Sequence, residues 1–142
     1  MGTLSLAARV GRQKYRTLDA VMTEKERFLY DAARGIDLID PYVGAGTSLL
    51  FSTDNELLAG IGVAANVVES LFFKVPFIAR YYALSKDAKG ASLLAAKMAV
   101  TTLAPNLAFL QVLPSHYWTM RKYVSRSYAR RQREQRRTDS WL

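Results

Sequence analysis

The alternation of apolar and polar residues divides the chain into helical blocks and predicts an all-α fold. The first helix begins at a capping box, residues 23–26, in which a hydroxyl and a carboxylate each satisfy a free amide. Behind it, apolar side chains recur at helical spacing as far as Ile36. We expect this helix to end near Gly35, because a residue that precedes a proline, here in Asp40-Pro41, is driven out of helical backbone angles. Residues 42–51 fit either a loop or a short buried segment.

Two apolar stretches of about 23 residues follow, at 57–79 and 91–113. A second capping box, residues 53–56, opens the first of them. Each stretch has the length that spans the hydrocarbon core of a bilayer, about 20 residues. Each also holds a proline, Pro76 or Pro105, that predicts a kink. We therefore expect a membrane-embedded antiparallel helical hairpin of two long, Pro-kinked helices, with an amphipathic N-terminal helix and a basic C-terminal helix. The alternative is a soluble bundle with two long core helices.

The chain accordingly divides into three parts. Residues 1–52 form a basic arm and the amphipathic helix, residues 53–114 the apolar hairpin, and residues 115–142 a basic helix and tail. The last helix carries an apolar stripe at helical spacing, at Tyr117, Met120, Val124 and Tyr128. Aromatic rings follow both apolar stretches, and such rings settle at membrane–water boundaries. The predicted interfacial aromatics are Tyr81, Tyr82, Tyr117 and Trp118.

Small and polar residues fall on one face of each apolar stretch, at steps of three and four. If residues 81–90 form the turn, Glu69 and Lys97 lie at depths that differ by about 6 Å. An isolated charge inside a bilayer is costly, so we predict that these two side chains face one another across the hairpin. A proton or ion path through Glu69 is the functional alternative. The other residues of this predicted packing seam are Ala59, Gly62, Asn66, Thr101, Ala104 and Ala108.

Charge is spread unevenly along the chain, which has 20 Lys and Arg against 12 Asp and Glu and a net charge of +8. Residues 1–18 carry four bases and no acid, residues 19–56 eight acids and three bases, and residues 121–142 eight bases and two acids. The positive-inside rule then puts both termini on one side of the membrane and residues 81–90 on the other. The acid-free start is typical of a mitochondrial targeting segment or of an ordinary basic helix. We expect a mitochondrial inner membrane or a prokaryotic plasma membrane.

The bases of the last block follow an apolar stretch directly, which favours contact with anionic lipid headgroups or other phosphates. They are Arg121, Lys122, Arg126, Arg130, Arg131, Arg133, Arg136 and Arg137. The same cluster could instead neutralise nucleic acid, with nearby tyrosines stacking on bases. It could also meet the acidic block, residues 19–56, in this chain or in a neighbour.

Composition argues against most chemistry. The chain has no Cys and one His, which excludes disulfides, thiolate nucleophiles and metal sites made of Cys or paired His. The acids of residues 19–56 do not have the spacing of an EF-hand loop. We expect no catalytic residue, metal, cofactor or small-molecule substrate. We interpret the chain as a small structural or accessory subunit of a membrane protein complex that binds other membrane subunits and anionic phospholipids. The alternative is a nucleic-acid-packaging, capsid-like coat protein, whose hairpins self-assemble while the Arg tail neutralises phosphates.

Overall fold

The computed structural model describes residue 18, residues 20–104, residue 107 and residues 115–141. Over these residues the fold is all-helical and has no strand, so the predicted all-α class is confirmed. The predicted basic arm lies outside the described residues. The elements are α2 (Glu24–Phe51), α3 (Glu56–Glu69), the π-helical turn η1 (Ser70–Lys74), α4 (Val75–Ser85), α5 (Ala88–Leu103) and α6 (His116–Asp139).

The first helix is longer than its sequence pattern predicts. Its capping box is confirmed: Thr23 Oγ1 accepts from the amide of Glu26 at 3.3 Å, and Glu26 Oε2 accepts from the amide of Thr23 at 2.9 Å. The predicted end is wrong, because α2 runs past Gly35 and through Pro41, so that residues 42–51 are helical. Proline removes one helical hydrogen bond and crowds the preceding turn. The packing of α3 along the second half of α2 outweighs this local preference.

α3, η1 and α4 follow one another without a break and form one helix of 30 residues. The second capping box is wrong, because the cap is Asn55, whose side chain accepts from the amides of Leu57 and Leu58. Pro76 sits in the first turn of α4, directly after the π-helical turn. The second predicted stretch begins at Ala88 and is helical to Leu103, while Pro105 and Ala108 lie outside the described residues.

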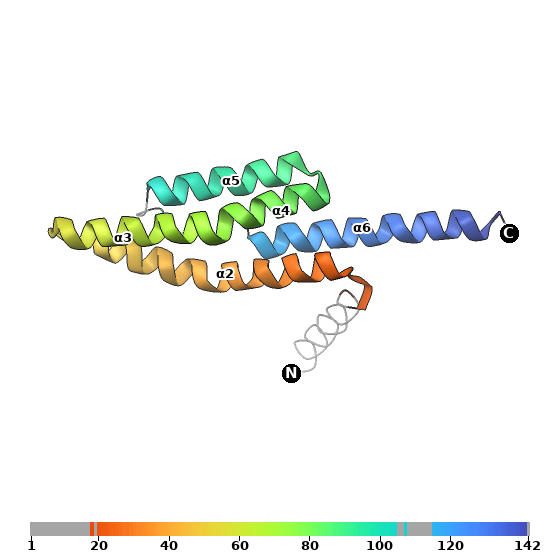
Figure 1. Cartoon of the computed structure of the whole chain (residues 1–142), viewed down its shortest axis with the longest axis horizontal. Coiled ribbons are helices and arrows are strands. Elements are labelled where there is room, and N and C mark those ends of the chain that lie inside the picture. The colour runs from red at the N-terminus through yellow and green to blue at the C-terminus, as the bar shows by residue number, and fades with distance from the viewer. Residues whose placement is uncertain (1–17, 19, 105–106, 108–114, 142) are drawn as a thin grey trace, which may run out of the picture.

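The helices form an elongated bundle (Figure 1). α2 and α3 make an antiparallel hairpin whose tip, residues 52–55, lies at one end of the molecule. α4 and α5 make a second antiparallel pair, joined at Lys86-Asp87. α6 begins in the middle of the bundle beside α2 and runs out to the opposite end. The apolar stripe predicted on α6 faces inward, with Met120 and Val124 fully buried.

Most buried side chains fall into two groups that lie one after the other along the bundle, while Glu26 and His116 are buried polar side chains outside both groups. The apolar core joins the first halves of α2, α5 and α6 with α4. Its members are Met22, Leu29, Tyr30, Ala33, Ile36, Phe77, Tyr81, Ala91, Leu94, Met120 and Val124. The polar core joins the second halves of α2 and α5 with α3 and η1. Its members are Asp40, Thr47, Asn66, Glu69, Ser70, Lys74, Lys97 and Thr101.

Candidate functional site

Four charged side chains are buried together in the polar core. Lys74 Nζ lies 2.5 Å from Asp40 Oδ1 and 3.1 Å from Glu69 Oε2, and Lys97 Nζ lies 3.9 Å from Asp40 Oδ2. They come from α2, from the last residue of α3 and the last residue of η1, and from α5, and none is more than 9% exposed. Two acids and two bases balance one another. Because a buried charge is costly unless it is paired, this cluster ties three helices together in one arrangement.

The predicted direct contact of Glu69 with Lys97 is replaced by a relay. Both residues belong to the cluster, but the ion pair of Glu69 is with Lys74 and that of Lys97 is with Asp40. Two residues stand between them. One is Lys74, the last residue of the π-helical turn, and the other is Asp40, in the part of α2 that the sequence did not predict. The sequence indicated neither of these two partners.

The π-helical turn explains why Glu69 can reach Lys74. In an α-helix, two residues five apart point about 140° away from each other, because a turn takes 3.6 residues. A π-helical turn closes with a bond between residues five apart, and here the amide of Val75 donates to the carbonyl of Ser70. This wider turn brings both charged side chains to the buried face. Its only sequence signal is Pro76, which has no amide to donate.

Neutral polar groups extend the cluster between α3 and α5. Asn66 Nδ2 donates to the carbonyl of Thr101 at 3.0 Å, and the hydroxyls of Ser70 and Thr102 lie 2.9 Å apart. Asn66 and Thr101 of the predicted seam therefore meet. Gly62 of that seam faces α2 instead, since a Cβ there would lie 3.0 Å from Leu50 Cβ. Ala59 and Ala104 are half-buried.

The surface around the polar core is apolar. Sixteen of the twenty large hydrophobic side chains that are exposed in the described residues lie between 38 and 75 or between 93 and 103. Over those same ranges the only exposed charges are Asp54 and Glu56, at the hairpin tip. The sixteen are Leu38, Ile39, Tyr42, Leu49, Phe51, Leu57, Leu58, Ile61, Val68, Leu71, Phe72, Phe73, Val75, Leu93, Val100 and Leu103.

Among the described residues, one helix, Glu56–Ser85, is long and apolar enough to cross a membrane by length and composition. Only 33% of its most apolar window is buried inside the fold, whereas the core helix of a soluble protein is mostly buried. The second predicted span does not meet this criterion over the part that the structure describes. One such helix is weak evidence on its own, and it neither establishes a membrane hairpin nor fixes a topology.

A carboxylate from α2 holds the start of α6. Asp37 Oδ1 accepts from the amide of His116 at 3.0 Å and lies 2.9 Å from its Nδ1, and Asp37 Oδ2 accepts from the amide of Tyr117 at 2.8 Å. The His116 ring and the two amides thus provide hydrogen-bond partners for a half-buried carboxylate between α2 and the start of α6. Sequence reasoning missed this contact, which no local pattern signals.

The acidic block also meets the basic helix at Glu26. Arg131 donates from Nη1 to Glu26 Oε1 at 2.9 Å and from Nη2 to Glu26 Oε2 at 3.2 Å, and its Nη2 donates to the carbonyl of Val21. Of the predicted phosphate contacts, Arg131 is thus engaged within the chain. Arg121 lies over the exposed ring of Trp118, 5.0 Å from its centroid. The other predicted contacts are exposed on α6, at Lys122, Arg126, Arg130, Arg133, Arg136 and Arg137.

Two expectations for residues 81–90 are wrong. Tyr81, predicted at a membrane boundary, is buried in the apolar core, and its hydroxyl donates to Asp87 Oδ2 at 2.7 Å. The hydroxyl of Tyr123 on α6 lies 3.4 Å from the carbonyl of Leu84, so this turn packs beside the basic helix and cannot lie across a membrane from it. Tyr82 is exposed, and Tyr117 is half-buried with its hydroxyl accepting from Tyr30 at 3.0 Å.

The described residues contain no group of three or more His, Asp or Glu side chains placed to hold a metal ion. In the buried cluster each carboxylate has a cationic partner, so its geometry suits cohesion between helices. Comparisons of the chain with protein-family models, with curated proteins and with solved structures found no match.

Proposed function

We propose that this chain is a small non-catalytic structural subunit of a membrane protein complex, embedded through α2, α3 and α5 around the polar core. The observation that carries the proposal is the reversal of the usual surface: charges are buried and large apolar side chains are exposed over the same stretch of helices. In water an exposed apolar surface promotes aggregation, whereas in a bilayer the lipid chains solvate it. Charged groups within a bilayer face the interior of the bundle and pair there, as these four do.

The dimensions of the apolar surface support the proposal. From Leu57 to Val75 the helix rises about 27 Å, at 1.5 Å per residue. The hydrocarbon core of a bilayer is about 30 Å thick. The surface is bounded by Asp54 and Glu56 at the tip and by Arg80 at the other end. We therefore place the α2–α3 hairpin in the membrane with α5 packed against it, so that α2 is the hairpin partner of the first apolar stretch, where the sequence suggested the second stretch.

The charges on the two ends support one orientation. Between Arg34 and Arg80 the single Lys or Arg is Lys74, which is buried. The hairpin tip carries only acidic charges, while the start of α2, the α4–α5 turn and α6 carry the bases. In this arrangement Lys86 and Lys89 lie on the basic side, which agrees with the positive-inside rule. The tip would then face the opposite side of the membrane from α6.

Cysteine labelling tests both insertion and orientation, because the natural chain has no Cys. We would place single cysteines at Thr53, in the tip, and at Ser140, at the end of α6, in the full chain reconstituted in sealed vesicles. An impermeant maleimide should label the two positions from opposite sides, and extraction should require detergent. Labelling of both from one side would contradict the orientation. Solubility of the purified chain in detergent-free, low-salt buffer would contradict insertion altogether.

A nucleic-acid-packaging role is the second candidate, favoured by the free end of α6. Past Arg131 this helix projects from the bundle with Arg133, Arg136 and Arg137 exposed (Figure 1). Phosphate neutralisation by such a helix would make binding fall steeply with salt. Co-purification of nucleic acid that is released by high salt, from a chain that stays soluble without detergent, would favour this role over a membrane subunit.

A further inference from the structure

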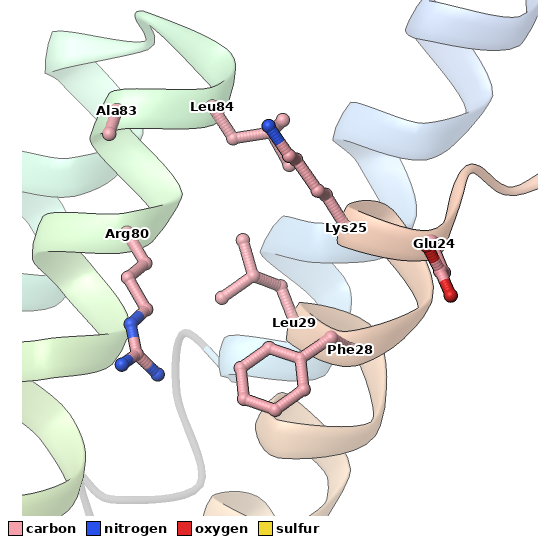
Figure 2. A pocket seen from close by; sticks show the side chains of 7 residues that line it. All are labelled: Glu24, Lys25, Phe28, Leu29, Arg80, Ala83 and Leu84. Atoms are coloured by element: carbon pink, nitrogen blue, oxygen red, sulfur yellow. The ribbon is translucent and has the colours of Figure 1, made fainter.

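A groove runs between α2 and α4 on the outside of the apolar core. Its wider part, with a volume of about 570 Å³, is lined by two cationic residues, Lys25 and Arg80, by Glu24, and by apolar side chains, Phe28 and Leu29 among them. Figure 2 shows Lys25 and Arg80 on opposite helices, with the Lys25 amine beside Leu84 and the Arg80 guanidinium turned toward Phe28, while the carboxylate of Glu24 points away. The wider part of the groove therefore carries two cationic side chains, one from each helix.

The groove continues toward the polar core as an apolar channel. A second hollow of about 310 Å³ shares Phe28, Leu29 and Arg80 with the first. It is lined beyond them mainly by aromatic and aliphatic side chains, Ile39, Phe72 and Phe73 among them, and by Glu69 of the buried cluster. From Arg80 to Phe73 the helix covers about 10 Å at 1.5 Å per residue. The groove therefore passes from a cationic rim to the apolar surface that we place in the bilayer.

The cations at the rim are available for a ligand. The guanidinium of Arg80 lies 5.6 Å from the centroid of the Phe28 ring, and the side chain is exposed. Among the described residues, neither Lys25 nor Arg80 has an ion pair with a carboxylate. A guanidinium matches a phosphate with two parallel donors, and basic side chains near a membrane surface attract anionic lipid.

We propose that this groove binds one anionic glycerophospholipid, with its phosphate at Lys25 and Arg80 and one acyl chain along Phe28, Phe72 and Phe73. This site rests on the proposed membrane function and adds a specific ligand to it. The site is separate from the basic residues of α6. The order of charge followed by apolar lining matches the order of headgroup and chain in such a lipid. An apolar helix of a partner subunit would fill the channel but leave the two cations unmatched.

A second groove supplies an internal control. It lies between α4 and α5, has a volume of about 490 Å³, and is lined by apolar and small side chains such as Val75, Ile78 and Met98 with no charged residue. It offers an acyl chain a similar channel without a headgroup site. Selectivity for anionic lipid is therefore expected between α2 and α4 and not between α4 and α5.

The test uses the full chain reconstituted in vesicles with a trace of phosphatidylglycerol or phosphatidylcholine, each carrying the same photoreactive acyl chain. Crosslinked peptides are then located by mass spectrometry. We expect phosphatidylglycerol to label the Phe72-Phe73 region several-fold more than phosphatidylcholine does. Arg80→Gln should abolish this preference, and Lys89→Gln, which removes a base from the nearby turn, should leave it unchanged. Ala32→Trp, which fills the channel, should reduce labelling there by both lipids.

Each other outcome counts against the site. Equal labelling of the Phe72-Phe73 region by both lipids, or equal effects of Arg80→Gln and Lys89→Gln, would overturn it. Labelling of the α4–α5 groove with none between α2 and α4 would indicate that a protein surface covers the site, and would also overturn it. Failure of the proposed function itself would look different, since a chain outside the bilayer would gain no acyl-chain crosslinks at any position.

Discussion

Around Leu29, Phe77 and Met120 the helices bury apolar side chains, whereas around Asp40, Lys74 and Lys97 they bury charges and expose apolar side chains. The change takes place within single helices, since α2 and α5 each contribute to both cores. Both halves are helical. What differs is the kind of side chain that is turned inward.

This contrast teaches that burial alone does not identify the solvent of a helix. The apolar core has the composition that excludes water, and the basic helix α6 packs on it. The polar core is held by ion pairs and hydrogen bonds, which gain strength when the surroundings are apolar. The two halves are thus built for different surroundings, water for one and lipid for the other under the proposed function. Each prediction below sets one half against the other.

The largest effect is expected from Lys74→Met. This change leaves Asp40 and Glu69 without their shared cation, and breaking a buried ion pair costs about 3–5 kcal/mol. The free energy of unfolding, measured by loss of helicity during denaturant titration of the micelle-bound chain, should fall by that amount. Adding Glu69→Gln restores the charge balance through Asp40 and Lys97 and should recover much of the loss. A Lys74→Met chain as stable as the natural one would show that the cluster is not what holds this half together.

Two neighbouring leucines on α5 make the matched comparison for the apolar core. Leu94 is 1% exposed and Leu93 is 54% exposed. Leu94→Ala should lower the free energy of unfolding by about 2–5 kcal/mol, because it opens a cavity. Leu93→Ala should change it by no more than about 0.5 kcal/mol in micelles. Similar losses for both variants in the same titration would mean that Leu93 is buried too and that the outward apolar surface is misplaced.

The sequence predicted features that depend on residues close together in the chain. The capping box at Thr23, the inward stripe of α6 and the burial of Asn66, Glu69, Lys97 and Thr101 all follow from helical spacing. Contacts between helices were harder to predict, because the two residues of each contact lie far apart in the chain. Asp37 and His116 are 79 residues apart, and neither carries a signal for the other.

Two prolines show how packing changes what the sequence predicts, since Pro41 was expected to end its helix and Pro76 to kink a continuous one. Pro41 lies inside α2, and Pro76 follows a π-helical turn within a continuous helix. Proline disfavours a helix locally, and packing along a whole neighbouring helix outweighs that preference. The pairing of Glu69 with Lys74 depends on the π-helical turn, so a wheel with 3.6 residues per turn could not place them together.

Two glycines of α3 test how closely α2 approaches in the polar core. A Cβ at Gly62 would lie 3.0 Å from Leu50 Cβ and 3.2 Å from the carbonyl oxygen of Thr47, whereas one at Gly60 would meet nothing within 4 Å. Gly62→Ala should destabilise the chain by about 1–3 kcal/mol through overpacking. Gly60→Ala should stabilise it by about 0.5–1 kcal/mol through helix propensity. Thermal unfolding of both variants measures the difference, and equal shifts would rule out a close contact at Gly62.

The smallest expected effect lies at the far end of the molecule, where Glu26 holds Arg131. Burial by itself would raise the pKa of Glu26, but the bonds from Arg131, the Thr23 amide and Ser127 outweigh it, and the pKa lies below its usual value of 4.5. A carboxyl with a lowered pKa contributes stability above its usual pKa, and this contribution is lost as the pH falls through the lowered value.

Glu26→Gln should therefore lower the free energy of unfolding by about 1 kcal/mol near neutral pH, a modest figure because Arg131 is 37% exposed. At a pH well below 4.5 the difference between the variant and the natural chain should shrink. The measurement is thermal unfolding at both pH values, with Glu134→Gln, an exposed acid on α6, as the control that should show no such dependence. A Glu26→Gln effect that is constant with pH would mean that its carboxylate charge does not hold α6. Because Glu26 belongs to the end that we assign to water, this contribution should also weaken with added salt, whereas the Lys74 cluster, shielded by the helices around it, should respond much less.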